Sequence, residues 1–184
     1  MRKIISNGIA FLRGSIFKLL KCRKKNIGKK VRLFKGTEIR LYKKSYYRLG
    51  NNLKVDEGAL IVACPSANLD LGDNVGIGPQ NRIICRKRIK IGKDTIMGPN
   101  VYIYDHDHKY NSNEGVDRFN YNVSDIVIGE KCWIGANVII LKGSHIGDRC
   151  LIAAGSVIKG NIPSGTVVIQ KRENFFRQIG DLND

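Results

Sequence analysis

Several features that mark common protein classes are scarce in this chain of 184 residues. Its five cysteines are Cys22, Cys64, Cys85, Cys132 and Cys150. Their odd number and the lack of any C-x-x-C pair argue against zinc ribbons and thiol redox motifs. No apolar run reaches about 18 residues, so we expect no membrane-spanning helix. The apolar start of the chain is interrupted by Asn7, Arg13 and Lys18 and no small-x-small cleavage site follows, so we expect no signal peptide.

Acidic residues are nearly absent from the first part of the chain. Residues 1–48 hold 16 Lys or Arg and one acidic residue, Glu38, whereas residues 49–184 hold 16 basic and 15 acidic residues. The net charge of +16 is therefore an N-terminal feature. Such a field attracts anionic lipid, nucleic acid or phosphorylated substrates. We do not expect nucleic acid as a partner, because the basic cluster lacks interleaved aromatic residues and no binding motif accompanies it.

A strict period of six is the strongest signal in the chain. Isoleucine recurs without a slip at Ile128, Ile134, Ile140, Ile146, Ile152 and Ile158. Neither a helix nor a simple strand produces this spacing, which indicates a structural repeat. Stacked short strands would bury such an aliphatic row, and three hexads would make one triangular turn of 18 residues. We interpret Gly129, Gly135 and Gly147, each directly after an isoleucine, as residues that supply a backbone conformation strained for others.

The fifth position of each hexad is small or β-branched, and Cys132 and Cys150 both occupy it. We expect these two residues to stack as buried thiols, which favours a reducing cytosol. Less regular hexads begin at Ile27 and give six turns in all. The hexads start at Ile27, Leu33, Ile39, Leu49, Val55, Ile61, Leu71, Ile77, Ile83, Ile91, Met97 and Ile103. We expect residues in excess of 18 per turn to form small loops at the corners. The largest excess, about residues 105–125, is polar and predicts a loop extruded from the solenoid.

The two ends of the chain do not follow the repeat. Residues 3–21 place Ile5, Ile9, Leu12, Ile16 and Leu19 at helical spacing, which predicts an amphipathic helix despite two glycines. Its apolar face is predicted to cap the open end of the solenoid or to contact an anionic membrane surface, and the two roles are compatible. We divide the chain into a basic helix at 1–26, a β-helix domain at 27–170 and a C-terminal tail with a short helix at 171–184.

The repeat resembles that of the hexapeptide-repeat acyltransferases, and IGKDTIMGPNVYIYDHDH resembles the galactoside- and maltose-type acetyltransferases and those of surface-polysaccharide pathways. The resemblance implies an all-β fold, a left-handed parallel β-helix of about six triangular coils. It also implies acetyl-CoA as acyl donor, no metal, and a homotrimer with sites between subunits. Matched to the family's pattern without gaps, the catalytic histidine falls on His108. Imidazole titrates near neutral pH and suits a general base that deprotonates a sugar hydroxyl.

The other acceptor-binding candidates surround this histidine or precede it. His106 is a candidate for substrate binding, together with Tyr104 and Asp105. Asp105 has the alternative role of orienting the imidazole. Asn81 matches a substrate-binding asparagine of the galactoside-type enzymes with a one-residue gap, and a stacked polar corner residue is the equal alternative. His145 is expected to be a corner residue.

The coenzyme candidates come from the C-terminal turns. The resemblance places Trp133 near the coenzyme, with a packing role as its alternative, and puts backbone contacts to the thioester and pantetheine at Ala136 and Ala154. Lys159 matches a polar coenzyme contact. Lys171 and Arg177 are candidates for the coenzyme phosphates. The chain departs from the family after the last turn, where QKREN replaces a Gly-x-Pro-Ala-Lys-like motif.

The resulting prediction is a cytoplasmic O-acetyltransferase that acts on a sugar hydroxyl in capsule, O-antigen or other surface-polysaccharide synthesis. Its acceptor would be a saccharide, carried on lipid phosphate at the inner membrane face if residues 1–32 contact the membrane. N-acetylation of an amino sugar is the alternative within enzymes. Two alternatives belong to other classes of protein. One is a γ-carbonic-anhydrase-like metal enzyme, and the other is a non-catalytic scaffold.

Overall fold

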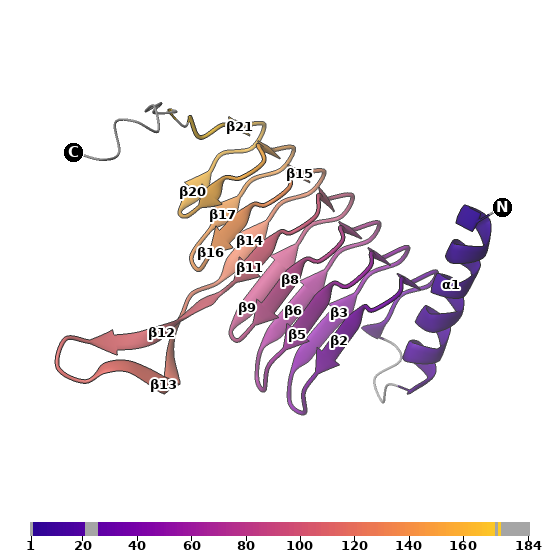
Figure 1. The fold of residues 1–184 in the computed structure, drawn as a ribbon, viewed down its shortest axis with the longest axis horizontal. Helices are drawn as coiled ribbons and strands as arrows, with labels where there is room; N and C mark the ends of the chain where they lie inside the picture. The colour runs from indigo at the N-terminus through magenta and orange to yellow at the C-terminus, as the bar shows by residue number, and fades with distance from the viewer. Residues whose placement is uncertain (1, 21–25, 172, 174–184) are drawn as a thin grey trace, which may run out of the picture.

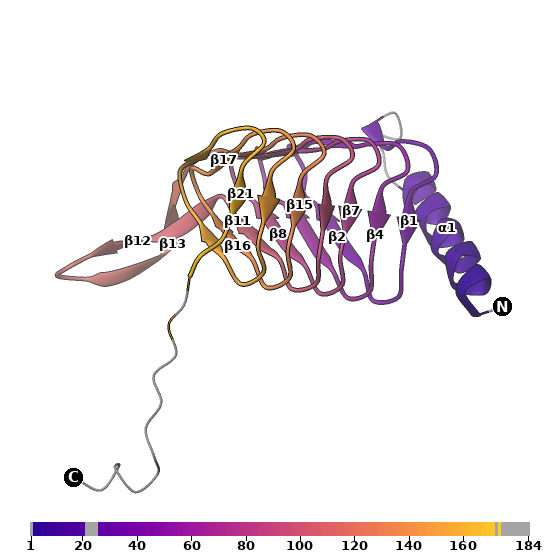
Figure 2. The ribbon, with the colours of Figure 1, turned by 90° about the horizontal axis from the view of Figure 1, so that it is seen from above.

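A computed structural model describes residues 2–20, 26–171 and 173. One helix, α1 (Arg2–Leu20), precedes a parallel β-solenoid with three faces, and one hairpin projects from the solenoid (Figures 1 and 2). The C-terminal helix and Arg177, both predicted from the sequence, lie outside the described residues. The all-β solenoid of about six turns is confirmed.

Each turn of the solenoid contributes one short strand to each face. Face 1 consists of β1 (Arg32–Leu33), β4 (Lys54–Val55), β7 (Gly76–Ile77), β10 (Ile96–Met97), β15 (Trp133–Ile134), β18 (Leu151–Ile152) and β21 (Val167–Val168). Face 2 consists of β2 (Glu38–Leu41), β5 (Leu60–Ala63), β8 (Arg82–Cys85), β11 (Tyr102–Tyr104), β16 (Ile139–Leu141) and β19 (Val157–Ile158). Face 3 consists of β3 (Tyr46–Leu49), β6 (Asn68–Leu71), β9 (Arg88–Ile91), β14 (Ile126–Ile128), β17 (His145–Ile146) and β20 (Asn161–Ile162).

The pairing registers between turns match the predicted hexad starts. On face 1, Leu33 pairs with Val55 and Met97 pairs with Ile134. On face 2, Ile83 pairs with Ile103. The paired aliphatic side chains point into the solenoid and are almost all fully buried, so they form one continuous core from the first turn to the last.

Small residues at the fifth hexad position line the inside of the corners. Cys132 and Cys150 are buried on neighbouring turns, as predicted, and their thiols lie 3.1 Å from the carbonyl oxygens of Gly147 and Pro163. Burial raises the pKa of the Cys132 thiol. Both residues therefore act as small apolar residues with weak donors.

The glycines that follow isoleucines have a different role from the predicted one. The left-handed backbone conformation falls two residues later, at Lys131, Asn137 and Arg149, with φ of 55°, 57° and 56°. A Cβ on Gly129 would lie 2.6 Å from the backbone nitrogen of Asp148, and one on Gly135 would lie 2.6 Å from that of Ala154. Neighbouring turns approach too closely there for any side chain, so the glycines are needed for contact between turns.

The residues in excess of 18 per turn also lie elsewhere than predicted. In the first three turns they lengthen the strands on either side of the corner between faces 2 and 3, where β2, β3, β5, β6, β8 and β9 each have four residues. The hairpin emerges from the same corner in the fourth turn, between β11 and β14. One edge of the solenoid therefore holds every insertion.

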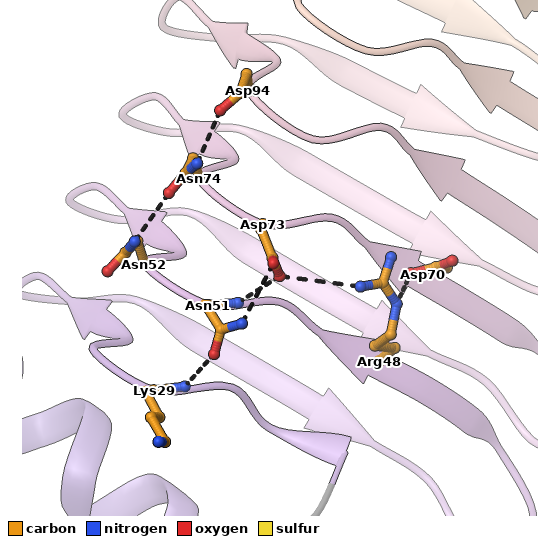
Figure 3. Close-up of polar contacts among 8 residues, drawn as sticks. All are labelled: Lys29, Arg48, Asn51, Asn52, Asp70, Asp73, Asn74 and Asp94. Atoms are coloured by element: carbon orange, nitrogen blue, oxygen red, sulfur yellow. Dashed lines mark hydrogen bonds and ion pairs between the residues drawn. The ribbon is translucent and has the colours of Figure 1, made fainter.

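Polar side chains stack along the corner that precedes face 1. Asn52 donates to Asn74, and Asn74 donates to Asp94, with distances of 2.9 and 2.8 Å. One residue earlier in the chain, the backbone and side-chain nitrogens of Asn51 donate hydrogen bonds to the carboxylate of Asp73. The side-chain oxygen of Asn51 accepts a hydrogen bond from the backbone nitrogen of Lys29 (Figure 3). Residues in the left-handed conformation are favoured to be Asn or Asp, which explains why these types repeat here.

Helix α1 lies across the open end of the solenoid and packs on β1 (Figures 1 and 2). Ala10 is fully buried, a Cβ on Gly14 would overlap the carbonyl oxygen of Val31, and Phe17 packs against the core. The Lys18 ammonium donates to the carbonyl of Gly28 at 3.1 Å. The helix therefore does cap the first turn, as one of the two predictions had it, but through small residues rather than through its apolar stripe.

Candidate active site

The extruded segment predicted at 105–125 is an antiparallel hairpin of β12 (His106–Asn111) and β13 (Gly115–Val123). It leaves the solenoid at the corner between faces 2 and 3 and extends well beyond the coil (Figures 1 and 2). Side chains alternate between its two sides, so His106 and His108 share one side and Asp107 lies on the other. The base of the hairpin thus carries two imidazoles held by regular structure.

Asp105 anchors the hairpin to the preceding turn. Its side chain is fully buried, and its carboxylate accepts hydrogen bonds from the backbone nitrogens of Arg86 at 2.8 Å and Lys87 at 2.7 Å. Burial opposes the charge, but the bonds from His106 and from these two backbone groups outweigh it, so the pKa of Asp105 is lowered. Its buried position favours the orienting role over direct contact with an acceptor.

His106 lies directly against this carboxylate. Its Nδ1 is 3.2 Å from Asp105 Oδ1, and an ionised carboxylate only accepts, so Nδ1 carries the proton and Nε2 holds the lone pair. The ring makes edge contacts with Tyr104 and Tyr121 at centroid distances of 6.0 and 5.4 Å. With 13% of its side chain exposed, His106 is fixed in place at the foot of the hairpin.

His108 is exposed one pleat further along β12. Its Nδ1 lies 3.1 Å from the backbone oxygen of Asp117, which can only accept, so the lone pair is again on Nε2. The pairing of the two strands shifts between His108 and Lys109, and the Asp117 carbonyl that contacts Nδ1 lies beside this bulge. The arrangement leaves an accessible nitrogen in the tautomer that a general base needs.

Sequence reasoning missed the residues that hold the two histidines. The Tyr121 ring lies 4.6 Å from that of His108, and the Arg86 guanidinium lies 3.5 Å above the same tyrosine. On the other side of β12, the Lys142 ammonium pairs with Asp107 at 3.0 Å. No local motif marks Arg86, Tyr121 or Lys142, because they are far apart in the chain and meet only when the hairpin folds back.

The other acceptor candidates differ in how far they are buried. Tyr104 is half-buried and stacks on Tyr102 at 6.3 Å. Asn81 is fully buried, and its oxygen accepts from the backbone nitrogen of Val101 at 2.8 Å. This position supports the alternative of a stacked corner residue for Asn81. His145 begins β17 on face 3 and is exposed, so it is a strand residue rather than the expected corner residue.

Most of the coenzyme candidates lie away from the edge that carries the hairpin. Trp133 is 56% exposed on face 1, and Ala136 and Ala154 follow on the corner between faces 1 and 2. Lys159 and Lys171 are exposed. Lys159 follows β19 at the same corner as the hairpin. Within one chain Trp133, Ala136 and Ala154 lie away from the corner of the hairpin, so the fold does not gather Trp133 and His108 into one pocket.

No group of three His, Cys, Asp or Glu side chains in the described part of the chain could hold a metal ion. His106 and His108 lie on the hairpin, whereas His145 lies on face 3. Within one chain, these three histidines are therefore not brought together as a metal-ligand set.

Comparison with known proteins identifies the repeat. Residues 125–160 match the family model described as bacterial transferase hexapeptide (six repeats). The matched segment is the one with the strict period of six. The predicted resemblance to the hexapeptide-repeat transferases is thereby confirmed.

Two curated relatives of this chain come from Escherichia coli K12. The chain is 32% identical over 127 residues to the protein named "Putative lipopolysaccharide biosynthesis O-acetyl transferase WbbJ", with 65% of each chain covered. It is 27% identical to a galactoside O-acetyltransferase, with 77% of this chain and 68% of the relative covered. The chain therefore spans slightly less than two thirds of the first relative.

Among solved structures, the solenoid is similar to AntD, an N-acyltransferase from Bacillus cereus that was crystallised with dTDP and 3-hydroxybutyryl-CoA. The TM-score is 0.64 at 17% identity, and 85% of each chain is covered. At this identity the likeness shows a shared fold.

Proposed function

We propose that this chain is an acyltransferase that moves an acetyl group from acetyl-CoA to a sugar hydroxyl in surface-polysaccharide synthesis, with His108 as general base. The observation that carries the proposal is the exposed imidazole of His108, whose Nδ1 faces the Asp117 carbonyl and whose Nε2 has no hydrogen-bond partner among the described residues. The match to relatives named as lipopolysaccharide and galactoside O-acetyltransferases supports the choice of donor and acceptor class.

The reaction needs one proton acceptor and one electrophile. His108 Nε2 takes the proton of the acceptor hydroxyl as its oxygen attacks the thioester carbonyl. The tetrahedral intermediate then expels the coenzyme thiolate, which takes the proton back from the imidazolium, so the enzyme returns to its starting state. No acyl-enzyme is formed, in keeping with the burial of Cys85, Cys132 and Cys150.

The coenzyme would lie along the corner of Ala136 and Ala154, with Trp133 beside it. These positions are at least partly open to solvent, and the alanines leave room for a ligand close to the backbone. Lys171 is an exposed cation suited to the coenzyme phosphates, and Lys159, also exposed, is the candidate for a polar coenzyme contact. Because the hairpin and this corner lie on different edges of one chain, we propose a homotrimer in which the hairpin of one subunit reaches the corner of the next.

The chain itself offers a reason for such an assembly. The hairpin extends away from the solenoid and exposes Tyr110, Val116 and Phe119, which are 71%, 59% and 88% exposed. Large apolar side chains on a projecting two-stranded ribbon are favoured to pack on another surface. A neighbouring subunit would cover them and place His108 opposite the coenzyme.

The test is release of free thiol from acetyl-CoA with a panel of sugar acceptors. We expect His108→Ala to lower kcat by about 10²- to 10⁴-fold with little change in coenzyme binding. His145→Ala is the matched control, because it removes an exposed histidine from face 3. Full turnover by His108→Ala would overturn the assignment of the base, and a loss confined to His106→Ala would move it to the histidine beside Asp105.

An amino group is the second candidate acceptor, favoured by the shared fold with the N-acyltransferase AntD. The same panel distinguishes the two when each hydroxyl sugar is paired with its amino analogue. Turnover with the amino sugar alone would replace O-acetylation by N-acetylation. Turnover with the hydroxyl sugar alone would exclude the amino acceptor.

A further inference from the structure

Helix α1 has two opposite faces with different surroundings. Ala10, Gly14 and Phe17 face the solenoid and are covered by it. The apolar residues on the outer face are Ile9, Leu12, Ile16, Leu19 and Leu20, which are 44%, 61%, 47%, 66% and 77% exposed. At about 100° per residue these five side chains fall within one arc of about 100°. We call them the outer stripe.

The outer stripe faces away from the solenoid along its axis. Helix α1 lies flat across the end of the coil, beyond the first turn (Figures 1 and 2). Its inner face is fixed by the close approach of Gly14 to Val31, so the stripe cannot turn inward without undocking the helix. The stripe is a contiguous apolar surface at one end of the molecule, and such surfaces mark a contact with a partner or a lipid.

The first turn surrounds this stripe with positive charge. Each of its three corners carries exposed lysine: Lys29 and Lys30, then Lys35, then Lys43 and Lys44. The second turn has Asn51, Asn52, Glu57, Pro65 and Ser66 at the same places. None of the five lysine ammonium groups forms an ion pair with another residue in the ranges that the structure describes.

We propose that this end of the molecule docks on an anionic lipid bilayer. The outer stripe enters the boundary between headgroups and acyl chains, and the corner lysines of the first turn lie at the lipid phosphates. Helix α1 lies in the plane of the interface, and the solenoid projects from it. In the described part of the chain no helix combines the length and hydropathy needed to cross a membrane. The proposal goes beyond the proposed acyl transfer and does not depend on it.

Charge favours a bilayer over a second copy of the chain. If two molecules met stripe to stripe, their first turns would face each other and bring ten corner lysines together, five from each. Like charges at that spacing repel, whereas an anionic surface neutralises them. The basic excess of residues 1–48, 16 Lys or Arg against one acidic residue, points to the same partner.

The experiment is sedimentation of the full chain with vesicles of phosphatidylcholine alone or with a phosphatidylglycerol fraction. We expect binding to the anionic vesicles that weakens as salt is added, and little binding to the neutral ones. Leu12→Ser combined with Ile16→Ser should lower the partition coefficient by about tenfold or more, since both side chains lose their apolar burial. Replacing Lys29, Lys30, Lys43 and Lys44 by Gln should lower it on anionic vesicles only.

Ile169→Ser is the matched control, because it removes an exposed apolar side chain, 69% exposed, beyond the other end of the solenoid. Wild-type protein that ignores anionic vesicles would overturn the proposal, as would stripe variants that bind like wild type. Molecular mass is measured on the same samples by light scattering. If the stripe substitutions lower the mass of the assembly, the stripe covers a second copy and the bilayer is excluded.

Discussion

Asp105 is the residue on which the geometry of the candidate site depends. It is fully buried, yet it keeps its charge because the backbone groups of Arg86 and Lys87 and the ring of His106 all donate to it. One carboxylate therefore joins the hairpin, the preceding turn and one of the two imidazoles.

We expect Asp105→Asn to lower the free energy of unfolding by about 1–3 kcal/mol at pH 7, because one carboxylate oxygen becomes an NH₂ that faces backbone donors. The pKa of Asp105 is lowered in the folded chain. Its stabilising effect is therefore complete above the unfolded pKa of about 3.9 and is lost as the pH falls through the folded pKa. The difference between wild type and variant should shrink below about pH 4.

Urea unfolding at a series of pH values measures this difference. Asp107→Asn is the control, since Asp107 is exposed and forms an ion pair with Lys142 at the surface. An exposed pair of this kind contributes about 0–1 kcal/mol. If the difference in free energy of unfolding between wild type and Asp105→Asn stays constant down to strongly acidic pH, the ionised carboxylate of Asp105 does not stabilise the fold.

At this scale the sequence predicts residue types better than their partners. The D-H-D-H run and the interrupted repeat draw attention to His106 and His108, and the structure places both on the hairpin. Their supports, Arg86 and Tyr121, have no spacing that links them to the histidines. The sequence also does not reveal why a glycine follows the isoleucine, because the approach of Gly129 to Asp148 depends on how the turns stack.

At the scale of elements, α1 combines a weak helix sequence with a close fit. Gly8 and Gly14 both lower helix propensity, but they differ in what surrounds them. Nothing lies within 4 Å of a Cβ built on Gly8, whereas one on Gly14 would overlap the Val31 carbonyl oxygen. Gly14 is thus a docking requirement, and Gly8 is not.

We expect Gly14→Ala to release α1 from the first turn and Gly8→Ala to stabilise it by up to about 1 kcal/mol. Amide hydrogen exchange within α1 measures both effects. Exchange should be faster than in wild type for Gly14→Ala and slower for Gly8→Ala. Slower exchange in both variants would mean that helix propensity alone determines the stability of α1 and that its contact with Val31 is unimportant.

The pairing registers of the solenoid could be predicted from the sequence. A strict period leaves few alternative registers, and a slip would move every isoleucine such as Ile134 or Ile152 out of the core. The position of the extra residues could not be predicted, since four added residues fit a longer strand as well as a corner loop. The sequence also does not determine which face of α1 packs on the solenoid, because an amphipathic pattern does not say which face is covered.

At the scale of the whole molecule, the solenoid separates functions along its length and around its edges. The basic end carries α1, the middle carries the hairpin, and the turns that follow carry Trp133 and Ala154. Each turn contacts only its neighbours, so the parts act together only through the rigid stack or through another subunit. The proposed trimer makes the second route testable.

Mixed trimers provide the test. His108→Ala removes the proposed base from the hairpin, and Ala154→Trp fills the proposed coenzyme corner. Each variant alone should be inactive. If every site takes its hairpin from one subunit and its corner from the next, a mixture that is unfolded and refolded together should recover about a quarter of wild-type activity, because one interface in four pairs two intact halves. The same proteins mixed without subunit exchange are the control and should stay inactive. A co-refolded mixture that also stays inactive, at wild-type trimer mass, would place both halves of the site in one chain, and the hairpin would then have to fold back onto its own solenoid.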